Sequence, residues 1–290
     1  MKKSRKLATL GICSALFLGL AACQQQHATS EGTNQRQSSS AKVPWKASCT
    51  NLNNQVSTEE VKSLLSAHLD PNSVDAFFNL VNDYNTIVGS TGLSGDFTSF
   101  THTEYDVEKI SHLWNQKKGD FVGTNCRINS YCLLKNSVTI PKLEKNDQLL
   151  FLDNDAIDKG KVFNSQDKEE FDILFSRVPT EATTDVKVHA EKMETFFSQF
   201  QFNEKARMLS VVLHDNLDGE YLFVGHVGVL VPADDGFLFV EKLTFEEPYQ
   251  AIKFASKEDC YKYLGTKYAD YTGEGLAKPF IMDNDKWVKL

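Results

Sequence analysis

Apolar residues recur every three or four positions through roughly the first two thirds of the chain after its N-terminal segment, and every second position thereafter. Ser57-Thr58-Glu59-Glu60 has the order of a capping box and precedes such a helical run. The same spacing predicts further helices over residues 73–88 and 105–114, from about residue 126, and over 166–175 and 188–200.

Segments rich in β-forming residues follow these helices. They span residues 207–215, 221–231 and 236–245, with turn residues at 216–219 and 233–236, and 248–254 is a candidate fourth strand. Polar residues at 256–259 open a late helix. Helices followed by adjacent strands predict an α+β fold, in which N-terminal helices pack on an antiparallel β-sheet.

The first 22 residues have a different character, with basic residues ahead of an apolar run. This order is typical of a secretory signal sequence, and the run is shorter than the roughly 20 residues that a membrane-spanning helix needs. The run ends in Leu20-Ala21-Ala22-Cys23, which resembles the lipobox of bacterial lipoproteins. That resemblance implies cleavage before Cys23 and a lipid on its sulfur. The alternative is an ordinary signal with a chance cysteine.

Composition changes again after Cys23. Residues 24–42 are rich in Gln, Ser and Thr and lack the apolar side chains that a core requires. We therefore expect a lipoprotein signal peptide over residues 1–22, a disordered tether over 23–48 and one globular domain over 49–290. The protein would lie on the extracellular face of a bacterial cell membrane, anchored through Cys23.

Net charge narrows the choice of partners. Removal of residues 1–22 takes away four of 31 Lys and Arg residues and leaves 27 against 39 Asp and Glu, a net charge of −12. Such an acidic chain disfavours binding to nucleic acid and electrostatic docking on anionic lipid. We expect a monomer whose contact with the membrane is the lipid itself.

Four cysteines fall in the expected globular domain: Cys49, Cys126, Cys132 and Cys260. Their spacing contains neither a CxxC pair nor a Cys/His zinc pattern, and we expect no metal and no other cofactor. A Cys49–Cys260 disulfide is permitted outside the cytoplasm, but sequence alone does not establish it. Cys126 and Cys132 are six positions apart, so on one helix they point to different sides.

Cys126 is the candidate nucleophile because of its place at the start of a helix. Thr124 or Asn125 can act as the N-cap, which puts Cys126 in the first turn. Unpaired N–H groups and the positive end of the helix dipole stabilise a thiolate there, and the same N–H groups could stabilise an oxyanion. The alternative is a buried cysteine that behaves as a small hydrophobe.

His226 is the candidate base, since it interrupts a strand otherwise made of Leu, Phe, Val and Gly. Alternation places it on a face with Leu222, Val224, Gly228 and Leu230. Glycines at positions 225 and 228 leave space beside it, as a close partner or substrate requires. The alternative is a hydrogen-bonded core histidine.

Glu241 is the candidate partner of His226 across the following hairpin. If Ala233-Asp234 is the centre of the turn, Glu241 faces His226 directly. If the centre is Asp234-Asp235, Glu241 becomes the diagonal neighbour on the same face, still within reach. A carboxylate there fixes the imidazole tautomer and supports its protonated form. The alternative is a structural ion pair, or a pair between Glu241 and a lysine.

A cysteine at a helix start, a histidine on a strand and a polar residue on the next strand resemble the papain-like peptidases, especially the NlpC-type cell-wall peptidases. The resemblance implies a helix packed on an antiparallel sheet, with Cys126 as nucleophile, His226 as general base and acid, and Glu241 as the orienting residue. Asn125-Cys126-Arg127 departs from the usual Asp-Cys-Ser, and Glu from the usual third residue.

A closer resemblance is to a Gram-positive lipoprotein family known as domain of unknown function 4300. It rests on "NCRI", "GHVGVLV", "FVEKLTFEEPYQAIKF" and "KPFIMDND", and covers the chain from about residue 51 to the end. This resemblance implies a bacterial surface location and brings no activity with it.

Two hypotheses of function follow. The first is an anchored thiol hydrolase that cuts peptide or amide bonds, with cell-wall peptide as the expected substrate and Gln116 or Asn115 as an added oxyanion donor. The second is a surface lipoprotein that binds without catalysis. The carboxylates within 153–160 and 215–220 lack the order of a calcium loop, and we interpret both segments as solvated loops.

Overall fold

The computed structural model describes residues 46–101 and 103–290. The predicted signal peptide, the lipid on Cys23 and the predicted tether as far as residue 45 lie outside these residues and stay predictions. Within the two described ranges, no helix is both long enough and apolar enough to pass through a membrane.

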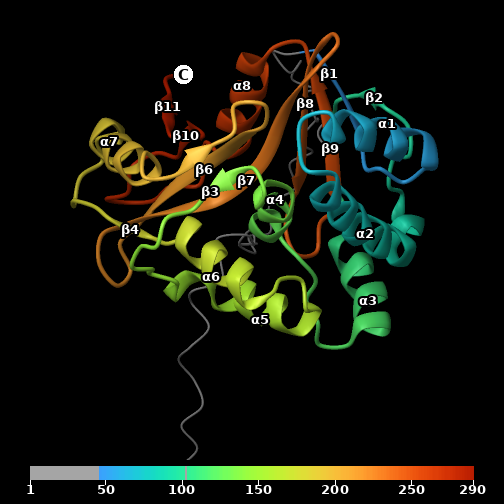
Figure 1. Ribbon diagram of the computed structural model, residues 1–290, viewed down its shortest axis with the longest axis horizontal. Coiled ribbons are helices and arrows are strands. Elements are labelled where there is room, and N and C mark those ends of the chain that lie inside the picture. The colour runs from blue at the N-terminus through green and yellow to red at the C-terminus, as the bar shows by residue number, and fades with distance from the viewer. Residues whose placement is uncertain (1–45, 102) are drawn as a thin grey trace, which may run out of the picture. The chain divides into compact units, whose positions relative to one another are not determined.

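A nine-stranded sheet, antiparallel in every described pair, organises the fold (Figure 1). Its strands follow the order β11–β10–β6–β7–β8–β9–β1–β2, and β4 pairs with β7 beside this path, while β3 and β5 form a separate pair. The bounds are β1 Ala47–Thr50, β2 Thr98–Ser99, β3 Val138–Thr139, β4 Val178–Pro179, β5 Gln201–Phe202, β6 Arg207–Asp215, β7 Tyr221–Ala233, β8 Gly236–Lys242, β9 Tyr249–Phe254, β10 Phe280–Asp283 and β11 Lys286–Val288.

Eight α-helices and two short 3₁₀ turns lie in the described ranges. Their bounds are α1 Gln55–Ser66, α2 Pro71–Val88, η2 Gly89–Thr91, α3 Val107–Lys118, α4 Cys126–Leu134, η3 Gln148–Leu150, α5 Phe151–Gly160, α6 Ser165–Leu174, α7 Val186–Phe197 and α8 Lys257–Lys267. The predicted α+β class, with N-terminal helices packed on an antiparallel sheet, is confirmed.

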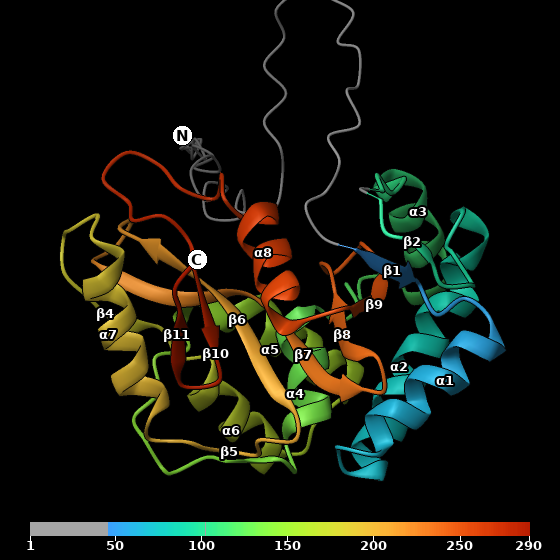
Figure 2. The same cartoon turned by 90° about the horizontal axis from the view of Figure 1, so that it is seen from above.

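Apolar side chains form two clusters, one on each face of the sheet. Helices α1 to α7 contribute to the larger cluster, and α8 contributes Cys260, Tyr261, Tyr263 and Leu264 to the smaller one. Figure 2 shows α8 on the opposite side of the sheet from α4, α5 and α6. The two faces are therefore buried by helices from different parts of the chain.

Most predicted elements are present with shifted ends. Helix α1 begins at Gln55, because the side chain of Asn54 accepts a hydrogen bond from the Ser57 N–H and caps the helix ahead of the predicted capping box. Strand β1 begins at Ala47, two residues before the predicted domain boundary at Cys49. Strand β6 has the predicted bounds.

The interpretation of residues 153–160 as a solvated loop is wrong. These residues belong to α5, and Asp153 is fully buried in its first turn. A buried carboxylate requires a partner, and Arg127 on α4 supplies it. The carboxylate therefore ties two helices together.

Candidate active site at the tip of helix α4

Helix α4 begins at Cys126, and Asn125 is its N-cap. The Asn125 side-chain oxygen accepts a hydrogen bond of 3.1 Å from the backbone N–H of Ile128. The neighbouring Thr124 instead accepts a 2.9 Å hydrogen bond from the side-chain amide of Asn129. Cys126 thus occupies the first helical position, where backbone N–H groups have no partner within the helix.

Asp153 on α5 holds this helix tip in place. Its Oδ1 accepts hydrogen bonds from Asn125 Nδ2 at 2.7 Å and Arg127 Nε at 2.9 Å, and its Oδ2 accepts one from Arg127 Nη2 at 2.7 Å. The two Arg127 bonds make a bidentate pair, which fixes orientation as well as distance. The residues on both sides of Cys126 are therefore clamped to a single carboxylate.

The tip of α4 meets an opening along one edge of β7. One edge of β7 pairs with β6. The other edge, which faces α4, pairs with β4 at Leu222 and with β8 from Val229 onward. Between those stretches, two α4 side chains bond to carbonyl oxygens of β7: Arg127 Nη1 to Val224 at 2.9 Å and Ser130 Oγ to Val227 at 3.2 Å. The helix thus replaces a strand as the hydrogen-bonding neighbour of β7.

A β-bulge changes the face on which His226 lies. In β6, Val211 lies opposite His226, and the next residue, Val212, lies opposite Val224. Gly225, between His226 and Val224, is therefore the extra residue of the bulge. The predicted alternation is wrong in consequence: Leu222 and Val224 pack in the larger cluster, whereas Leu230 packs in the smaller one.

His226 and Glu241 contact each other as neighbours in the hairpin. The β7–β8 turn pairs Ala233 with Gly236, which is the register with Asp234-Asp235 at its centre and places Glu241 diagonally from His226. His226 Nε2 lies 2.5 Å from Glu241 Oε2. Both side chains are buried, with 2% exposure for each residue.

The side chains of Cys126 and His226 interact and shift each other's pKa. Burial alone raises the pKa of the Cys126 thiol, but the His226 charge, its hydrogen bond and Arg127 lower that pKa below its ordinary value. Burial alone lowers the pKa of His226, but Cys126 and Glu241 together raise it to about 9. Both shifts favour the charged forms, a thiolate beside an imidazolium.

The second oxygen of Glu241 is also occupied. Tyr263 on α8 donates a 2.5 Å hydrogen bond to Glu241 Oε1. Burial raises the pKa of Glu241, but the Lys267 charge and the bonds from His226 and Tyr263 outweigh it and lower that pKa to about 2. Tyr268 stacks on the His226 ring, with centroids 4.9 Å apart and planes 23° from parallel.

The two predicted oxyanion donors lie on the exposed surface of α3. Gln116 Nε2 lies 3.0 Å from His112 Nε2 on the same helix. The backbone oxygen of Asn115 accepts a hydrogen bond from Gly119. In the described part of the chain, no hydrogen bond joins either amide to Cys126.

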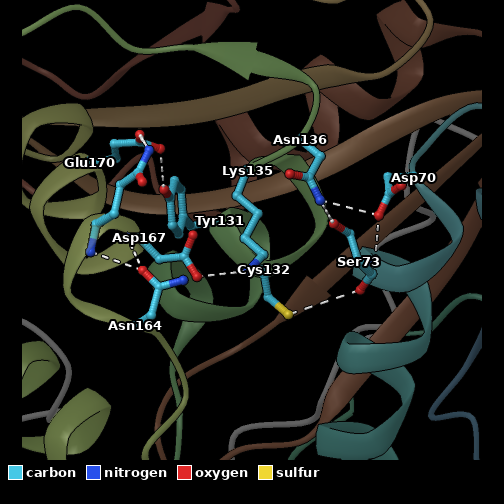
Figure 3. Close-up of polar contacts among 10 residues, drawn as sticks. Asp70, Ser73, Tyr131, Cys132, Lys135, Asn136, Asn164, Asp167 and Glu170 are labelled. Atoms are coloured by element: carbon cyan, nitrogen blue, oxygen red, sulfur yellow. Dashed lines mark hydrogen bonds and ion pairs between the residues drawn. The ribbon is translucent and has the colours of Figure 1, made fainter.

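Cys49, Cys132 and Cys260 are free thiols, so the candidate Cys49–Cys260 disulfide is absent between these described residues. Cys132 contacts the Ser73 carbonyl oxygen at 4.0 Å, between α4 and α2, and lies beside the Lys135–Asp167 pair (Figure 3). Burial raises its pKa to about 12. Cys132 therefore packs between α4 and α2.

We did not predict Asp153, Tyr263 and Lys267 as parts of the site from the sequence. Tyr263 and Lys267 are four positions apart on α8, a spacing that puts both on one helix face. Only the docking of α8 on the sheet shows that Glu241 lies opposite that face. The residues around Asp153 are compatible with a helix, but most of them are polar, and we therefore interpreted the segment as a loop.

Comparison with known proteins adds the family and little more. The family model described as "Domain of unknown function (DUF4300)" matches residues 48–288, and the chain belongs to that family. No curated protein matches the chain. No solved structure matches it either.

Proposed function

We propose that this member of the DUF4300 family is a papain-like thiol hydrolase that cuts peptide or amide bonds. The observation that carries the proposal is the unbroken chain of contacts from the Cys126 thiol through the His226 imidazole to the Glu241 carboxylate. These residues come from a helix tip and two strands, and this is the order in which a nucleophile, a base and an orienting group act.

The tautomer of His226 follows from its partners. Glu241 occupies Nε2, which leaves Nδ1 as the nitrogen that exchanges a proton with Cys126. Glu241 stays ionised, since its pKa is about 2, and therefore stabilises the imidazolium throughout the reaction.

In the first half-reaction, the Cys126 thiolate adds to the carbonyl carbon of the substrate. The carbonyl electron pair moves to oxygen and gives a tetrahedral oxyanion. The backbone N–H of Cys126, at the first position of α4, can stabilise this charge. The intermediate collapses, the C–N bond breaks, and the amine leaves with the proton from His226 Nδ1.

The second half-reaction returns the enzyme to its starting state. His226, now neutral, takes a proton from water as the water oxygen attacks the thioester carbonyl carbon. The C–S bond then breaks, the acid product leaves, and Cys126 is again a thiolate beside an imidazolium. No redox change and no co-reactant other than water is needed.

Location suggests the substrate. The signal-like N-terminus and the lipobox-like Cys23 would hold the domain outside the cell membrane, where peptide cross-links of the cell wall are abundant amide substrates. The NlpC-type resemblance of the Cys126 and His226 segments supports the same choice. We therefore propose cell-wall peptide as the substrate class.

One observation favours a second function, binding without catalysis. Cys126 is only 6% exposed and His226 only 2%, so a substrate must displace neighbouring side chains to reach the thiol. If these neighbours do not move, the same charged cluster stabilises the fold alone, and the protein would be a surface lipoprotein that binds its ligand elsewhere.

Digestion of cell-wall material separates the two functions. Purified peptidoglycan and soluble wall peptides are incubated with the wild-type protein and with Cys126→Ser, and products are identified by mass spectrometry. The hydrolase predicts new amine and carboxylate ends with the wild type alone. Identical product profiles would eliminate cell-wall peptide as substrate.

A further inference from the structure

Lys267 lies at the far end of the Cys126–His226–Glu241 contacts. Its Nζ is 3.7 Å from Glu241 Oε1 and donates a 2.9 Å hydrogen bond to the Tyr263 hydroxyl. The Tyr263 hydroxyl in turn donates to the same Glu241 oxygen. Lys267 comes from the last turn of α8, and its side chain is 30% exposed, whereas that of Glu241 is fully buried.

The four groups carry charges of alternating sign. In the reactive state they are the Cys126 thiolate, the His226 imidazolium, the Glu241 carboxylate and the Lys267 ammonium, and their sum is zero. Without Lys267 the buried three would carry a net negative charge, which a low-dielectric interior disfavours.

The other titratable groups packed around Glu241 do not supply this charge. Burial raises the pKa of the thiols of Cys49 on β1 and Cys260 on α8, and of the phenols of Tyr105 and Tyr263. All four are therefore neutral at neutral pH.

The groups that face Cys126 are occupied in other ways. Arg127 is neutralised by Asp153. Lys242, whose pKa burial lowers to about 7, donates to the backbone carbonyls of Thr244, Phe245 and Glu247. Among these described neighbours, Lys267 is the cation that contacts Glu241.

We propose that Lys267 is a positioning residue of the site, which acts through Glu241 and keeps the thiolate–imidazolium pair intact as the pH falls. The inference rests on the proposed function, because it concerns the reactive state of the same residues. Lys267 touches neither the substrate nor the reacting atoms. Its effect therefore depends on the presence of the Glu241 carboxylate.

The test is the pH dependence of Cys126 alkylation by iodoacetamide, followed by peptide mapping so that each cysteine is read separately. In Lys267→Met, the midpoint for Cys126 is expected to rise by less than about one pH unit, because Lys267 contacts Glu241 and not the thiol itself. Lys267→Arg keeps the charge and should keep the wild-type midpoint.

Two further variants distinguish positioning from a general effect of charge or folding. Lys262→Met removes an exposed lysine from the same helix, whose closest acid is Asp259 at 3.9 Å, and should leave the midpoint unchanged. In a Glu241→Gln background, Lys267→Met should add no further shift, since the group through which Lys267 acts is gone.

The outcomes separate this inference from the proposed function. A wild-type midpoint well below that of an ordinary thiol, together with an unshifted Lys267→Met, would overturn the role of Lys267 alone. Equal shifts in Lys262→Met and Lys267→Met would overturn it as well. A wild-type midpoint near 8.5 would remove the thiolate and, with it, both proposals.

Discussion

His226 Nε2 and Glu241 Oε2 lie 2.5 Å apart, across a hairpin whose paired register has already ended at Val229–Val240. The separation of the strands gives the α4 tip access to His226. The hydrogen bond keeps the imidazole oriented in a region where no strand of the described part of the chain pairs with β7 on that side.

Glu241→Gln should lower the pKa of His226 from about 9, because the substitution removes a negative charge that favours the imidazolium. The alkaline limb of any hydrolytic activity should move to lower pH, and its rate should fall roughly 10²- to 10⁴-fold, as when the orienting acid of a triad is lost. NMR titration of the His226 ring checks the shift without a substrate. An unchanged titration midpoint would show that Glu241 does not support the imidazolium.

Asp153→Asn should destabilise the fold by about 3–5 kcal/mol, because it leaves the Arg127 guanidinium without its buried counter-charge. Urea denaturation measures this change in the free energy of unfolding. Asp155→Asn on the same helix is the matched control, since Asp155 is half-exposed and pairs with Lys159 at the surface. Its expected effect is below about 1 kcal/mol. Equal effects of the two variants would show that Asp153 is not a clamp.

Gly228→Ala should destabilise the protein by about 1–3 kcal/mol. A Cβ at this position would overlap the Phe239 ring and lie 2.8 Å from the Val240 carbonyl oxygen, so the β7–β8 pair would have to separate further. Gly273→Ala is the control, because its nearest neighbour would be 3.6 Å away. Thermal unfolding of both variants compares them. No difference between the two would mean that the hairpin adapts to the added methyl group.

Alkylation at neutral pH should modify Cys126 and leave Cys132 and Cys260 untouched in the folded protein. Burial raises the pKa of Cys132 to about 12 and that of Cys260 well above its ordinary value, whereas the pKa of Cys126 is lowered. Peptide mapping after brief iodoacetamide treatment reads all three sites, and treatment in denaturant supplies the control in which all react. Preferential labelling of Cys132 would contradict the assignment of the two roles.

Acid should weaken the fold through His189. Its pKa is lowered by burial, and its ring lies 4.4 Å from that of His214. The unfolded chain takes up a proton near pH 6.5 while the folded chain does so only at lower pH, so stability falls as pH drops below about 6.5. His189→Gln should reduce this loss between roughly pH 7 and 5, whereas His112→Gln on the exposed face of α3 should not. The slope of unfolding free energy against pH decides between them.

The sequence encodes the helix tip and the hairpin because both depend on nearby residues. Capping by Asn125 is a local interaction, and the Asp234-Asp235 turn sets the cross-strand neighbours of His226. The predicted alternation of faces is wrong at Gly225, because the bulge there depends on how Leu213 of the neighbouring strand packs against that glycine.

The supporting residues were not predictable for a related reason. Lys267 and Tyr263 reach Glu241 only because α8 covers the face of the sheet opposite α4, which is a property of the assembled fold. Asp153 reaches Arg127 from a helix whose polar sequence resembles a loop. Gln116 is the opposite case. We predicted it as a donor because it precedes Cys126 in the sequence, but its position on α3 exposes its side chain to solvent.

Whether Cys126 is a nucleophile is measured most directly by the site of acylation with an activated ester such as p-nitrophenyl acetate. Acid-quenched wild-type protein is digested and mapped by mass spectrometry, beside Cys126→Ser and His226→Ala. We expect one acetyl group on Cys126 of the wild type, lost again with time as water attacks the thioester, and little labelling in either variant. Acetylation confined to surface lysines and equal in all three proteins would contradict this expectation.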